Sequence, residues 1–578
     1  MKQSWFSKFS RRKPYFVGVI LILVGLISTA FQPTDLYFRI KKNFEIFSEA
    51  YSMVVVEYVD EVDPAELMQV GINAIFNYLD PYTNFFDVAS NERAEILGRS
   101  KYAGIGLSLD VKNGKALVVQ IIDGSPAQRA GIRIGDEITS IDGLGTSLLE
   151  PEEMQNLLMG EMGSKVRLVI KTADDQSSEL LIGRANLEPK SLSYGAIINT
   201  NADVVLEYEL GQEKVEQVDS SQVDRPNGIA YLKIDEFGQG VNAEFRKSLE
   251  ALMKGGKVEG LILDLRGNPG GILQESVQML DYILEPNIAV VQTKGRLAEY
   301  NATYTTREDM IYSGPIVVLI NEGSASASEI VSGVIQDLDR GIILGKTSFG
   351  KGLVQIVKPL PYNNSMKYTI SRYYIPSGRS IQSVEYLHDN QQSTRSRGLD
   401  ESDYLTRNGR TVRGGRGIEP DIEMNPNLLS SFQSELLRLG FVSDYIQSTT
   451  ISDVTQINNE FINDQVDSFI ATFQASEIQQ WKQMVIQTDS LEHELRNMNV
   501  LDPNIEESID RIFDGIDQQA EEFLLTKKDE IAILFKLEYA RFYQGNRVWK
   551  RNSIAQDSLV WKALEVLDDA ALYNAYLN

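Results

Sequence analysis

Apolar and polar residues alternate with different periods along this chain of 578 residues, and the changes of period mark its regions. Up to about residue 95, and again after Pro426, apolar residues recur at helical spacing with charged faces between them, which predicts helices. Residues 96–186 instead hold short β-rich runs separated by Gly and Asp turns, the pattern of a small β-domain, and apolar and polar residues alternate over 165–172 as they do in a strand. From residue 229 to about 424, strand and helix candidates alternate, which predicts helices packed on a sheet.

These patterns predict a multidomain α+β protein. After the β-domain comes a polar connection with an insertion at about residues 200–227, which we interpret as a hairpin or a mobile segment. The last helices form a separate domain in this interpretation, because prolines are scarce there and helical spacing continues to the end. The predicted parts are a basic tip with an apolar segment (1–34), a helical arm (35–95), the β-domain (96–186), an α/β core (187–425) and a helical domain (426–578).

The first 34 residues carry the signals of an exported protein. Five basic residues and no acidic one come first: Lys2, Lys8, Arg11, Arg12 and Lys13. An uncharged apolar run of 17 residues follows, from Tyr15 to Phe31, which is at the short end of a membrane-spanning helix. Because positive charge stays in the cytoplasm, we expect a single-pass anchor in the inner membrane with the rest of the chain in the periplasm. Ser28 and Ala30 leave a second interpretation open, in which a signal peptide is removed and the protein is soluble in the periplasm.

Composition narrows the chemistry. The formal net charge of −25 argues against nucleic acid as a partner, since its phosphates would be repelled. The chain has no cysteine, which excludes thiol nucleophiles, disulfides and cysteine-bound metals. Its two histidines, His388 and His493, lie more than a hundred residues apart in polar contexts, so we expect no histidine metal site. We therefore predict neither a metal nor a cofactor.

The β-domain carries two motifs that resemble those of PDZ domains. “GSPAQRAGIRIGDEITSIDG”, residues 124–143, is similar to their central signature, and “YAGIGL”, residues 102–107, resembles their carboxylate-binding loop and the strand after it. The successive N–H groups of Gly104, Ile105 and Gly106 are suited to capture the terminal carboxylate of a peptide, because glycines let the backbone turn around the anion. The following strand would accept the peptide as an added strand, with the next helix on the other side of the groove.

A serine-rich turn between a strand and a helix is the first candidate for catalysis. The apolar run 316–320 predicts a strand, “GSASAS” follows as a small-residue turn, and apolar spacing then predicts a helix. Hydrolases expose a nucleophilic serine in this context, and the N–H groups at the helix start suit a developing oxyanion. Ser324, Ser326 and Ser328 are all candidates at this point, and the alternative is that they only cap the helix.

Lys351, in “GKTSFGKG” (residues 345–352), is the candidate base. Without cysteine, and with neither histidine in a motif, lysine is the remaining realistic base for a serine, as in Ser-Lys variants of the catalytic triad. Such a lysine must lose water contacts so that its neutral amine is populated near neutral pH, and its sequence neighbours carry no carboxylate. On a strand, Gln355 shares a face with Lys351 and would orient it.

The same stretch nearly matches a phosphate-binding loop, G-x-x-x-x-G-K-[ST]. Gly352 stands where that motif needs Ser or Thr, and residues 353–360 are rich in β-branched residues where it needs a helix. Export also removes the chain from ATP. A nucleotide site is therefore the weaker interpretation of Lys351.

Several motifs together resemble the carboxyl-terminal processing peptidases, also called tail-specific proteases. The likeness runs over about residues 40–425 and rests, in family order, on “LDLRGNPGG”, “NEGSASASEI”, “GKTSFGKGLVQ”, “YYIPSGRSIQ” and “GIEPDIEM”. The resemblance implies that Ser326 is the nucleophile, that Lys351 is its base and that Gln355 orients the lysine.

The same resemblance implies the oxyanion donors and the activity. The donors are the backbone N–H groups of Ala327 and Gly271, with Gly270 as the alternative. The expected activity is that of an extracytoplasmic serine endopeptidase that cuts proteins near exposed, unstructured C-termini, with the PDZ domain capturing the tail and able to gate the active site. The helical domain 426–578 lies outside the motifs, and we expect it to dimerise, to bind an adaptor or to cover the active site. The alternative function is a non-catalytic PDZ scaffold, which would need neither the serine nor the lysine.

Overall fold

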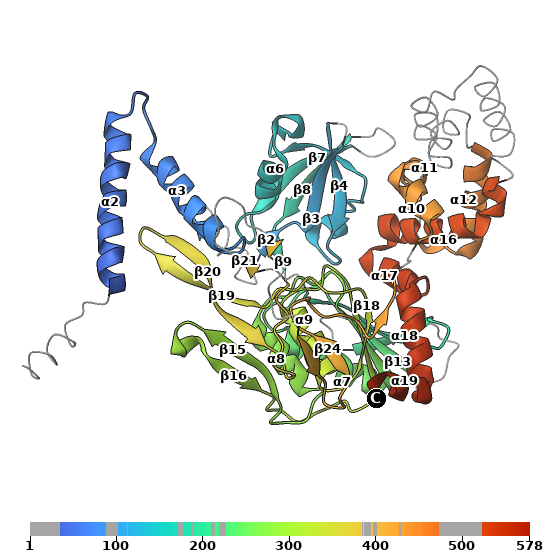
Figure 1. Cartoon of the computed structure of the whole chain (residues 1–578). Coiled ribbons are helices and arrows are strands. Elements are labelled where there is room, and N and C mark those ends of the chain that lie inside the picture. The colour runs from blue at the N-terminus through green and yellow to red at the C-terminus, as the bar shows by residue number, and fades with distance from the viewer. Residues whose placement is uncertain are drawn as a thin grey trace, which may run out of the picture. The chain divides into compact units, whose positions relative to one another are not determined.

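The computed structural model describes residues 35–578 apart from 88–101, 113, 172–176, 188–189, 210–213, 219–226, 384, 387–394, 397–401, 427–428, 450, 452–453 and 473–522. The chain divides into two compact units, one ending at Phe85 and one beginning at Phe86, and Figure 1 labels the elements of each. The predicted membrane segment and both histidines lie outside the described residues. In the part of the chain that is described, no helix is both long and apolar enough to cross a membrane.

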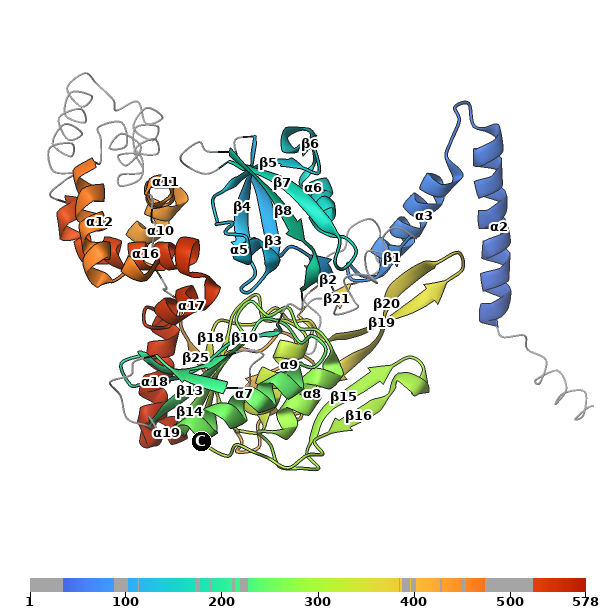
Figure 2. The same cartoon turned by 180° about the vertical axis from the view of Figure 1, so that it is seen from behind.

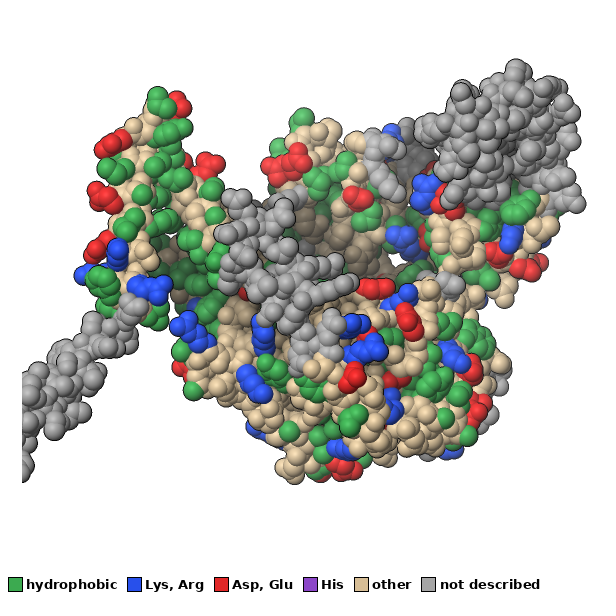
Figure 3. All heavy atoms as spheres, in the orientation of Figure 1, with side chains coloured by type: hydrophobic (Ala, Val, Ile, Leu, Met, Phe, Trp, Pro, Cys, Tyr) green, Lys and Arg blue, Asp and Glu red, His purple; other side chains and the backbone are tan. Residues whose placement is uncertain are grey.

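The first unit contains the helical arm that the sequence predicts. Its elements are α2 (Asp35–Glu57) and α3 (Pro64–Leu79), followed by the short strand β1 (Asn84–Phe86) at the boundary with the second unit. α3 begins at Pro64, which suits a first helical turn, and the Asp63 carboxylate accepts a hydrogen bond from the Ala65 N–H at 2.7 Å. The arm keeps large apolar side chains such as Tyr37 and Phe44 on its surface. Green side chains are visible along it in Figure 3.

The β-domain is a small sheet with short helices. Its elements are β2 (Tyr102–Gly104), β3 (Leu107–Lys112), β4 (Lys115–Ile121), α5 (Pro126–Arg129), β5 (Glu137–Ile141), β6 (Leu144–Gly145), η1 (Thr146–Leu148), α6 (Pro151–Leu158), β7 (Lys165–Lys171), β8 (Ser177–Gly183) and β9 (Ala185–Leu187). The sheet order is β3-β4-β5-β7-β8, with β6 paired to β5 and a separate pair β2-β9. In β7 the alternate residues Val166, Leu168 and Ile170 are buried, so the strand predicted from the alternation is confirmed.

An eight-stranded sheet, counted over the described residues, forms the centre of the α/β core. In sheet order its strands are β12 (Lys214–Gln217), β11 (Val204–Glu209), β10 (Leu192–Ile198), β13 (Asn227–Ile234), β14 (Lys257–Asp264), β17 (Ile316–Ile320), β18 (Ile342–Gly345) and β25 (Ile422–Glu423). The strands from β13 to β25 pair in parallel, and β10, β11 and β12 extend the sheet antiparallel. Parallel strands are covered on both faces, which is why β17 is an unbroken apolar run.

The segment at 204–217, interpreted from the sequence as part of a hairpin or a mobile insertion, is a hairpin of this sheet. Leu206 of β11 lies opposite Ile197 of β10 and, on its other side, opposite Gln217 of β12. The side chain of Glu207 is buried and pairs with arginines from the last helices of the chain. The segment therefore belongs to the core sheet, and its polar sequence reflects charges that find partners far along the chain.

Helices cover both faces of the core sheet. They are α7 (Val241–Gly255), α8 (Leu273–Asp281) and α9 (Ala327–Asp337) on one face, and α18 (Ser558–Asp568) and α19 (Ala570–Leu577) on the other. Alternate residues of β14 separate the two layers: Leu261 and Leu263 face the first group of helices, whereas Ile262 packs against Leu559 and Leu564 of α18. Figure 2 shows the two helix layers with the sheet between them.

This packing corrects the predicted separate domain over residues 426–578. Its first part has a core of its own, in which Leu436, Ile446, Phe535 and Tyr539 are buried. That part contains α10 (Ser431–Arg438), α11 (Phe441–Ser448), η3 (Val454–Gln456), α12 (Asn459–Thr472), α16 (Lys528–Tyr539) and the π-helix η4 (Ala540–Gln544). The helices α18 and α19 belong with the core sheet instead, and α17 (Asn546–Ile554) joins the two parts, because it packs against α16 and η4 while Ile554 at its end lies in the cluster of the core sheet. Helical spacing shows which side of a helix is apolar, but not which surface that side covers.

A further antiparallel group of strands carries one residue that matters for the site, Tyr373 of β20. The group contains β15 (Ala289–Gly295), η2 (Ala298–Tyr300), β16 (Ala302–Thr305), β19 (Leu353–Leu360) and β20 (Asn364–Tyr374). β20 pairs with both β19 and β15, and β15 pairs with β16. Two short pairs complete the core: β21 (Glu385–Tyr386) with β22 (Arg395–Ser396), and β23 (Asp403–Leu405) with β24 (Thr411–Arg413).

Candidate active site

Ser326 stands between β17 and α9, in the order of strand, turn, serine and helix that the sequence predicts. Its backbone has φ 53° and ψ −111°, and non-glycine residues rarely adopt a positive φ. Strained positions of this kind cluster at functional sites, where the surrounding structure holds them. Ser326 stays partly exposed, whereas Ser324 and Ser328 are fully buried. Their hydroxyls donate to the carbonyl oxygens of Leu265 and Asn268, each at 2.9 Å, so the outer serines hold a neighbouring turn.

The carboxylate of Glu329 joins the serine loop to the lysine loop. Glu329 is fully buried in the first turn of α9 and accepts hydrogen bonds from the N–H groups of Ser326 (2.7 Å), Gly350 (2.6 Å) and Lys351 (2.9 Å). The Ser348 hydroxyl donates to it as well, at 2.5 Å. Burial raises the pKa of Glu329 above its ordinary value, and the four donors oppose that rise. One side chain thus sets the backbone positions of the candidate nucleophile and the candidate base.

Tyr373, at the end of β20, makes a second link between the two loops. Its hydroxyl lies 2.7 Å from the carbonyl oxygen of Lys351 and 3.0 Å from that of Ser326, and it can donate to either. Burial, together with the charge of Glu329, raises the pKa of the Tyr373 phenol well above its ordinary value, so the phenol remains a donor. Ser326 and Lys351, which are 25 residues apart in the sequence, are therefore held next to each other through their backbones.

Lys351 lies two residues before β19, and its side chain reaches Gln355 on that strand. The Nζ atom of Lys351 donates to Oε1 of Gln355 at 3.3 Å, so the expected contact is present, although Lys351 itself lies outside the strand and the pairing of β19 with β20 is irregular between Val354 and Gln355. Gly350 has φ 88°, and a Cβ there would lie 2.2 Å from the Oγ of Ser383, so the position next to the lysine requires glycine. Because β19 is a strand, the loop lacks the helix N-terminus that a phosphate-binding loop uses.

The turn after β14 lies against the peptide that joins Ser326 and Ala327. A Cβ placed on Gly270 would come within 2.8 Å of the Ser326 Cβ and 2.9 Å of the Ala327 nitrogen. The Gly270 N–H donates to Oδ1 of the buried Asn268 at 2.9 Å, so this donor is already used. Over the described residues, neither the Gly271 N–H nor the Ala327 N–H donates a hydrogen bond. Of the two glycines considered as oxyanion donors, Gly271 is therefore the one whose backbone N–H remains available to bind an oxyanion.

The predicted carboxylate loop lies between β2 and β3. Gly104 ends β2 and forms an isolated bridge with Met159, directly after α6. The side chain of Ile105 is buried in the core of the β-domain. Gly106 has φ 83°, and a Cβ there would lie 2.3 Å from the Cβ of Ser125, which leaves no room for another residue type. The three predicted residues form one tight turn that meets the segment after α6.

Sequence reasoning missed three residues that organise the site: Glu329, Tyr373 and Asn268. Glu329 did leave a signal, because a serine with a glutamate three residues later, before an apolar run, has the spacing of a capping box. That spacing predicts the hydrogen bond from the Ser326 N–H to the Glu329 carboxylate. It does not predict the bonds from the lysine loop, which depend on how two distant segments meet.

Comparisons with known proteins identify the family. The model of peptidase family S41 matches residues 228–392, and a PDZ domain model matches residues 117–172. The carboxy-terminal-processing protease of Bartonella bacilliformis is 30% identical over 385 residues, which cover 66% of this chain and 82% of that protein. The carboxy-terminal processing protease CtpB of Bacillus subtilis is 29% identical over 344 residues, covering 59% of this chain and 66% of that protein.

A solved structure of a photosystem II D1 C-terminal processing protease is also similar. It is 24% identical, with 66% of this chain and 93% of that chain covered and a TM-score of 0.35. The fold, the serine at the start of α9 and the curated relatives together define the class as a serine peptidase with a PDZ domain. The chain belongs to peptidase family S41 and, within it, to the carboxy-terminal processing proteases. Both family models end before residue 393, so α17 and α18 lie outside them.

Proposed function

We propose that this protein is an extracytoplasmic serine endopeptidase that cleaves proteins near their C-termini with a Ser326–Lys351 dyad. The observation that carries the proposal is the pair of backbone links through Glu329 and Tyr373. A structural role alone would not need a serine with positive φ tied to a lysine loop by two buried polar side chains. Such pre-organisation is what a nucleophile and its base require.

The proposed reaction uses these residues as follows. The Oγ of Ser326 attacks the scissile carbonyl carbon while the neutral amine of Lys351 takes the serine proton, and Gln355 keeps the lysine oriented. The N–H groups of Gly271 and Ala327 donate to the oxygen that becomes negative, at the start of α9 where the helix dipole also favours negative charge. Lys351 then gives its proton to the leaving amine. Water hydrolyses the acyl-enzyme, with the lysine again acting as base.

The PDZ domain has the role of delivering the substrate. In this proposal the N–H groups from Gly104 to Gly106 bind the terminal carboxylate of an unstructured protein tail, and β3 takes the tail as an added strand. The segment upstream of the tail then reaches Ser326, and movement of the PDZ domain gates that access. The basic and apolar residues before position 35 hold the protein in the inner membrane with its catalytic part in the periplasm, or act as a removed signal peptide.

The dyad is tested with an unfolded protein that carries an apolar C-terminal tail. We expect the wild-type chain to cleave it, and Ser326→Ala and Lys351→Ala to leave it intact while their thermal unfolding stays close to wild type. Lys346→Ala, which changes the other lysine of the same loop, is the matched control and should retain cleavage. Cleavage by Lys351→Ala at neutral pH would refute the lysine base. Tight binding of the tail by a wild-type chain that never cuts it would favour a scaffold.

Substrate delivery is tested by comparing a free C-terminal carboxylate with the same tail ending in an amide. We expect the amide to be cleaved more slowly through a higher KM, because the turn at Gly104 to Gly106 loses its anionic ligand. An equal KM for the two substrates would remove the PDZ domain from tail capture without touching the assignment of Ser326.

A further inference from the structure

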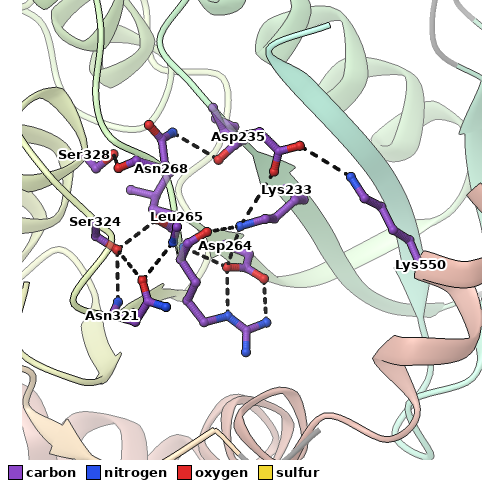
Figure 4. A network of polar contacts seen from close by, with 12 residues as sticks. Lys233, Asp235, Asp264, Leu265, Asn268, Asn321, Ser324, Ser328 and Lys550 are labelled. Carbon is purple, nitrogen blue, oxygen red and sulfur yellow. Dashed lines mark hydrogen bonds and ion pairs between the residues drawn. The ribbon is translucent and has the colours of Figure 1, made fainter. Parts of the chain in front are cut away.

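The turn that carries Gly271 begins at a buried charge cluster, drawn in Figure 4. Asp264, the last residue of β14, is 1% exposed and receives two hydrogen bonds from Arg266, from Nε at 3.0 Å and from Nη2 at 2.6 Å. Lys233 of β13 lies 3.3 Å from the same carboxylate and also donates to the carbonyl oxygen of Arg266, inside the turn. The Tyr231 hydroxyl donates to Asp264 at 2.6 Å.

The cluster continues into the last helices of the chain. Nη2 of Arg266 lies 2.6 Å from Oδ2 of Asp557, the residue that caps α18. At the other end, Nζ of Lys550 on α17 lies 3.5 Å from the carboxylate of Asp235, which in turn lies 3.8 Å from Lys233. The charges alternate through six residues: Lys550, Asp235, Lys233, Asp264, Arg266 and Asp557.

The first half of the same turn is also held by the serine loop. Ser324 and Ser328 donate to the carbonyl oxygens of Leu265 and Asn268, and the Gly267 N–H donates to Oδ1 of Asn321 at 2.8 Å. Figure 4 shows these contacts beside the charge cluster. The turn is thus fastened on one side to the nucleophile loop and on the other to helices that follow it by almost three hundred residues.

The turn needs such support because of its composition. Gly267, Gly270 and Gly271 all have positive φ, and glycine has more conformational freedom than any other residue. An oxyanion donor acts efficiently only if it stays within about 0.5 Å of the productive position. Burial alone would raise the pKa of Asp264, but Arg266 and Lys233 outweigh burial and hold that pKa well below its ordinary value. The anchor of the turn therefore stays charged.

We propose that Asp557 is a positioning residue for catalysis: by holding Arg266 from α18, it fixes the turn so that the Gly271 N–H meets the oxyanion together with the Ala327 N–H. This inference rests on the proposed function. It assigns the C-terminal helices a part in the reaction, although they lie outside both family models. Lys550 supports the same turn from α17 through Asp235 and Lys233.

Asp557→Asn separates this role from helix capping. Oδ1 of Asp557 accepts from the Leu559 N–H at 2.9 Å, and asparagine caps a helix as well as aspartate does. The substitution removes the charge at Oδ2 that Arg266 binds. We expect kcat to fall about 10- to 100-fold with KM unchanged, because a misplaced group loses roughly that much. Asp557→Glu, which keeps the charge, should recover part of the loss.

A peptide boronic acid provides a readout that depends on the oxyanion donors. It forms a tetrahedral adduct with a reactive serine and places an oxygen where the oxyanion forms. We expect Asp557→Asn to weaken this adduct by the same factor as kcat, while affinity for the product peptide stays at the wild-type value. Glu565→Gln is the matched control on α18, because Glu565 pairs with Lys562 on the surface, at 2.7 Å, away from Arg266, and the substitution should change neither quantity.

The outcomes separate the two proposals. If Ser326→Ala abolishes cleavage while Asp557→Asn cuts and binds the boronic acid like wild type, the positioning role is wrong and the dyad stands. If Asp557→Asn loses activity together with hydrogen-exchange protection of α18, the residue only caps its helix and the positioning role is again wrong. If Ser326→Ala still cleaves, the proposed function itself fails.

Discussion

Glu329 and Asp264 are both fully buried carboxylates that hold an active-site loop, yet they are satisfied in different ways. Glu329 accepts hydrogen bonds from three backbone N–H groups and one hydroxyl, and none of these four donors is a cation. Asp264 lies against Arg266 and Lys233. Burial raises the pKa of Glu329, and the two cations hold the pKa of Asp264 low.

The difference shows how a buried carboxylate is stabilised by dipoles on the one hand and by charges on the other. Dipoles reduce the desolvation penalty of Glu329 without cancelling it, so its charged form stays costly. At Asp264 the opposite charges of Arg266 and Lys233 cancel more of the desolvation penalty. The loss of either cation would leave a buried negative charge without full compensation. The serine side of the site therefore loses stability as pH rises through the folded pKa of Glu329, and the turn side loses stability when a charge is removed.

Glu329→Ala should have the largest effect. It leaves three N–H groups and a hydroxyl without their buried acceptor, and each unsatisfied group costs about 1–3 kcal/mol. We expect the free energy of unfolding of the peptidase core to fall by at least about 3 kcal/mol in denaturant titration, and cleavage to be lost. Glu322→Ala, an exposed glutamate of the same loop, is the control and should leave both unchanged. A stable and active Glu329→Ala would show that the two loops do not depend on this carboxylate.

Tyr373→Phe should have an intermediate effect, because it removes only the hydroxyl between the Ser326 and Lys351 carbonyl oxygens. A buried hydrogen bond contributes about 1 kcal/mol, so the unfolding midpoint should drop modestly. We expect kcat to decrease about tenfold while KM stays the same, since the backbones of base and nucleophile separate slightly. Tyr374→Phe changes the neighbouring, partly exposed ring and serves as the control. Equal kcat in the two variants would remove Tyr373 from the positioning of the dyad.

The smallest effect is the response to pH, and it has opposite signs at the two carboxylates. The folded pKa of Asp264 lies below its ordinary value of 3.8, so its contribution to stability is present above that pH and is lost as pH falls below it. The folded pKa of Glu329 lies above its ordinary value of 4.5, so its contribution is present below pH 4.5 and is lost as pH rises through the folded pKa. A tenfold difference in proton affinity between the folded and unfolded chain corresponds to about 1.4 kcal/mol at either carboxylate.

Hydrogen exchange measured over this acidic range would test those signs in Asp264→Asn and Glu329→Gln. We expect the protection lost in Asp264→Asn, relative to wild type, to grow as pH rises. The protection lost in Glu329→Gln should shrink as pH rises from 4.5. If the loss of protection changed with pH in the same direction in both variants, Asp264 would not be stabilised by cations and Glu329 by dipoles as we describe.

Much of the fold and of the candidate site follows from local pattern. The alternation in 165–172 predicted the strand found at 165–171, and the run 316–320 followed by small residues predicted the strand, turn and helix around Ser326. The contact between Lys351 and Gln355 was also expected, from a strand that would carry both on one face. In the structure β19 begins at Leu353, so only Gln355 lies on it. These features depend on neighbours in the chain, and backbone geometry is enough to relate them.

Tertiary structure decided the rest. Helical spacing in residues 546–578 showed apolar faces, but only packing placed α18 on the core sheet and brought Asp557 to Arg266. The capping-box spacing carried a signal for one bond of Glu329, which sequence reasoning missed, whereas the bonds from Gly350 and Lys351 required two loops to meet. A buried polar group must find partners wherever the fold offers them, and those partners can be hundreds of residues away. Local periodicity carries no information about which distant residues the fold will bring next to a buried polar group.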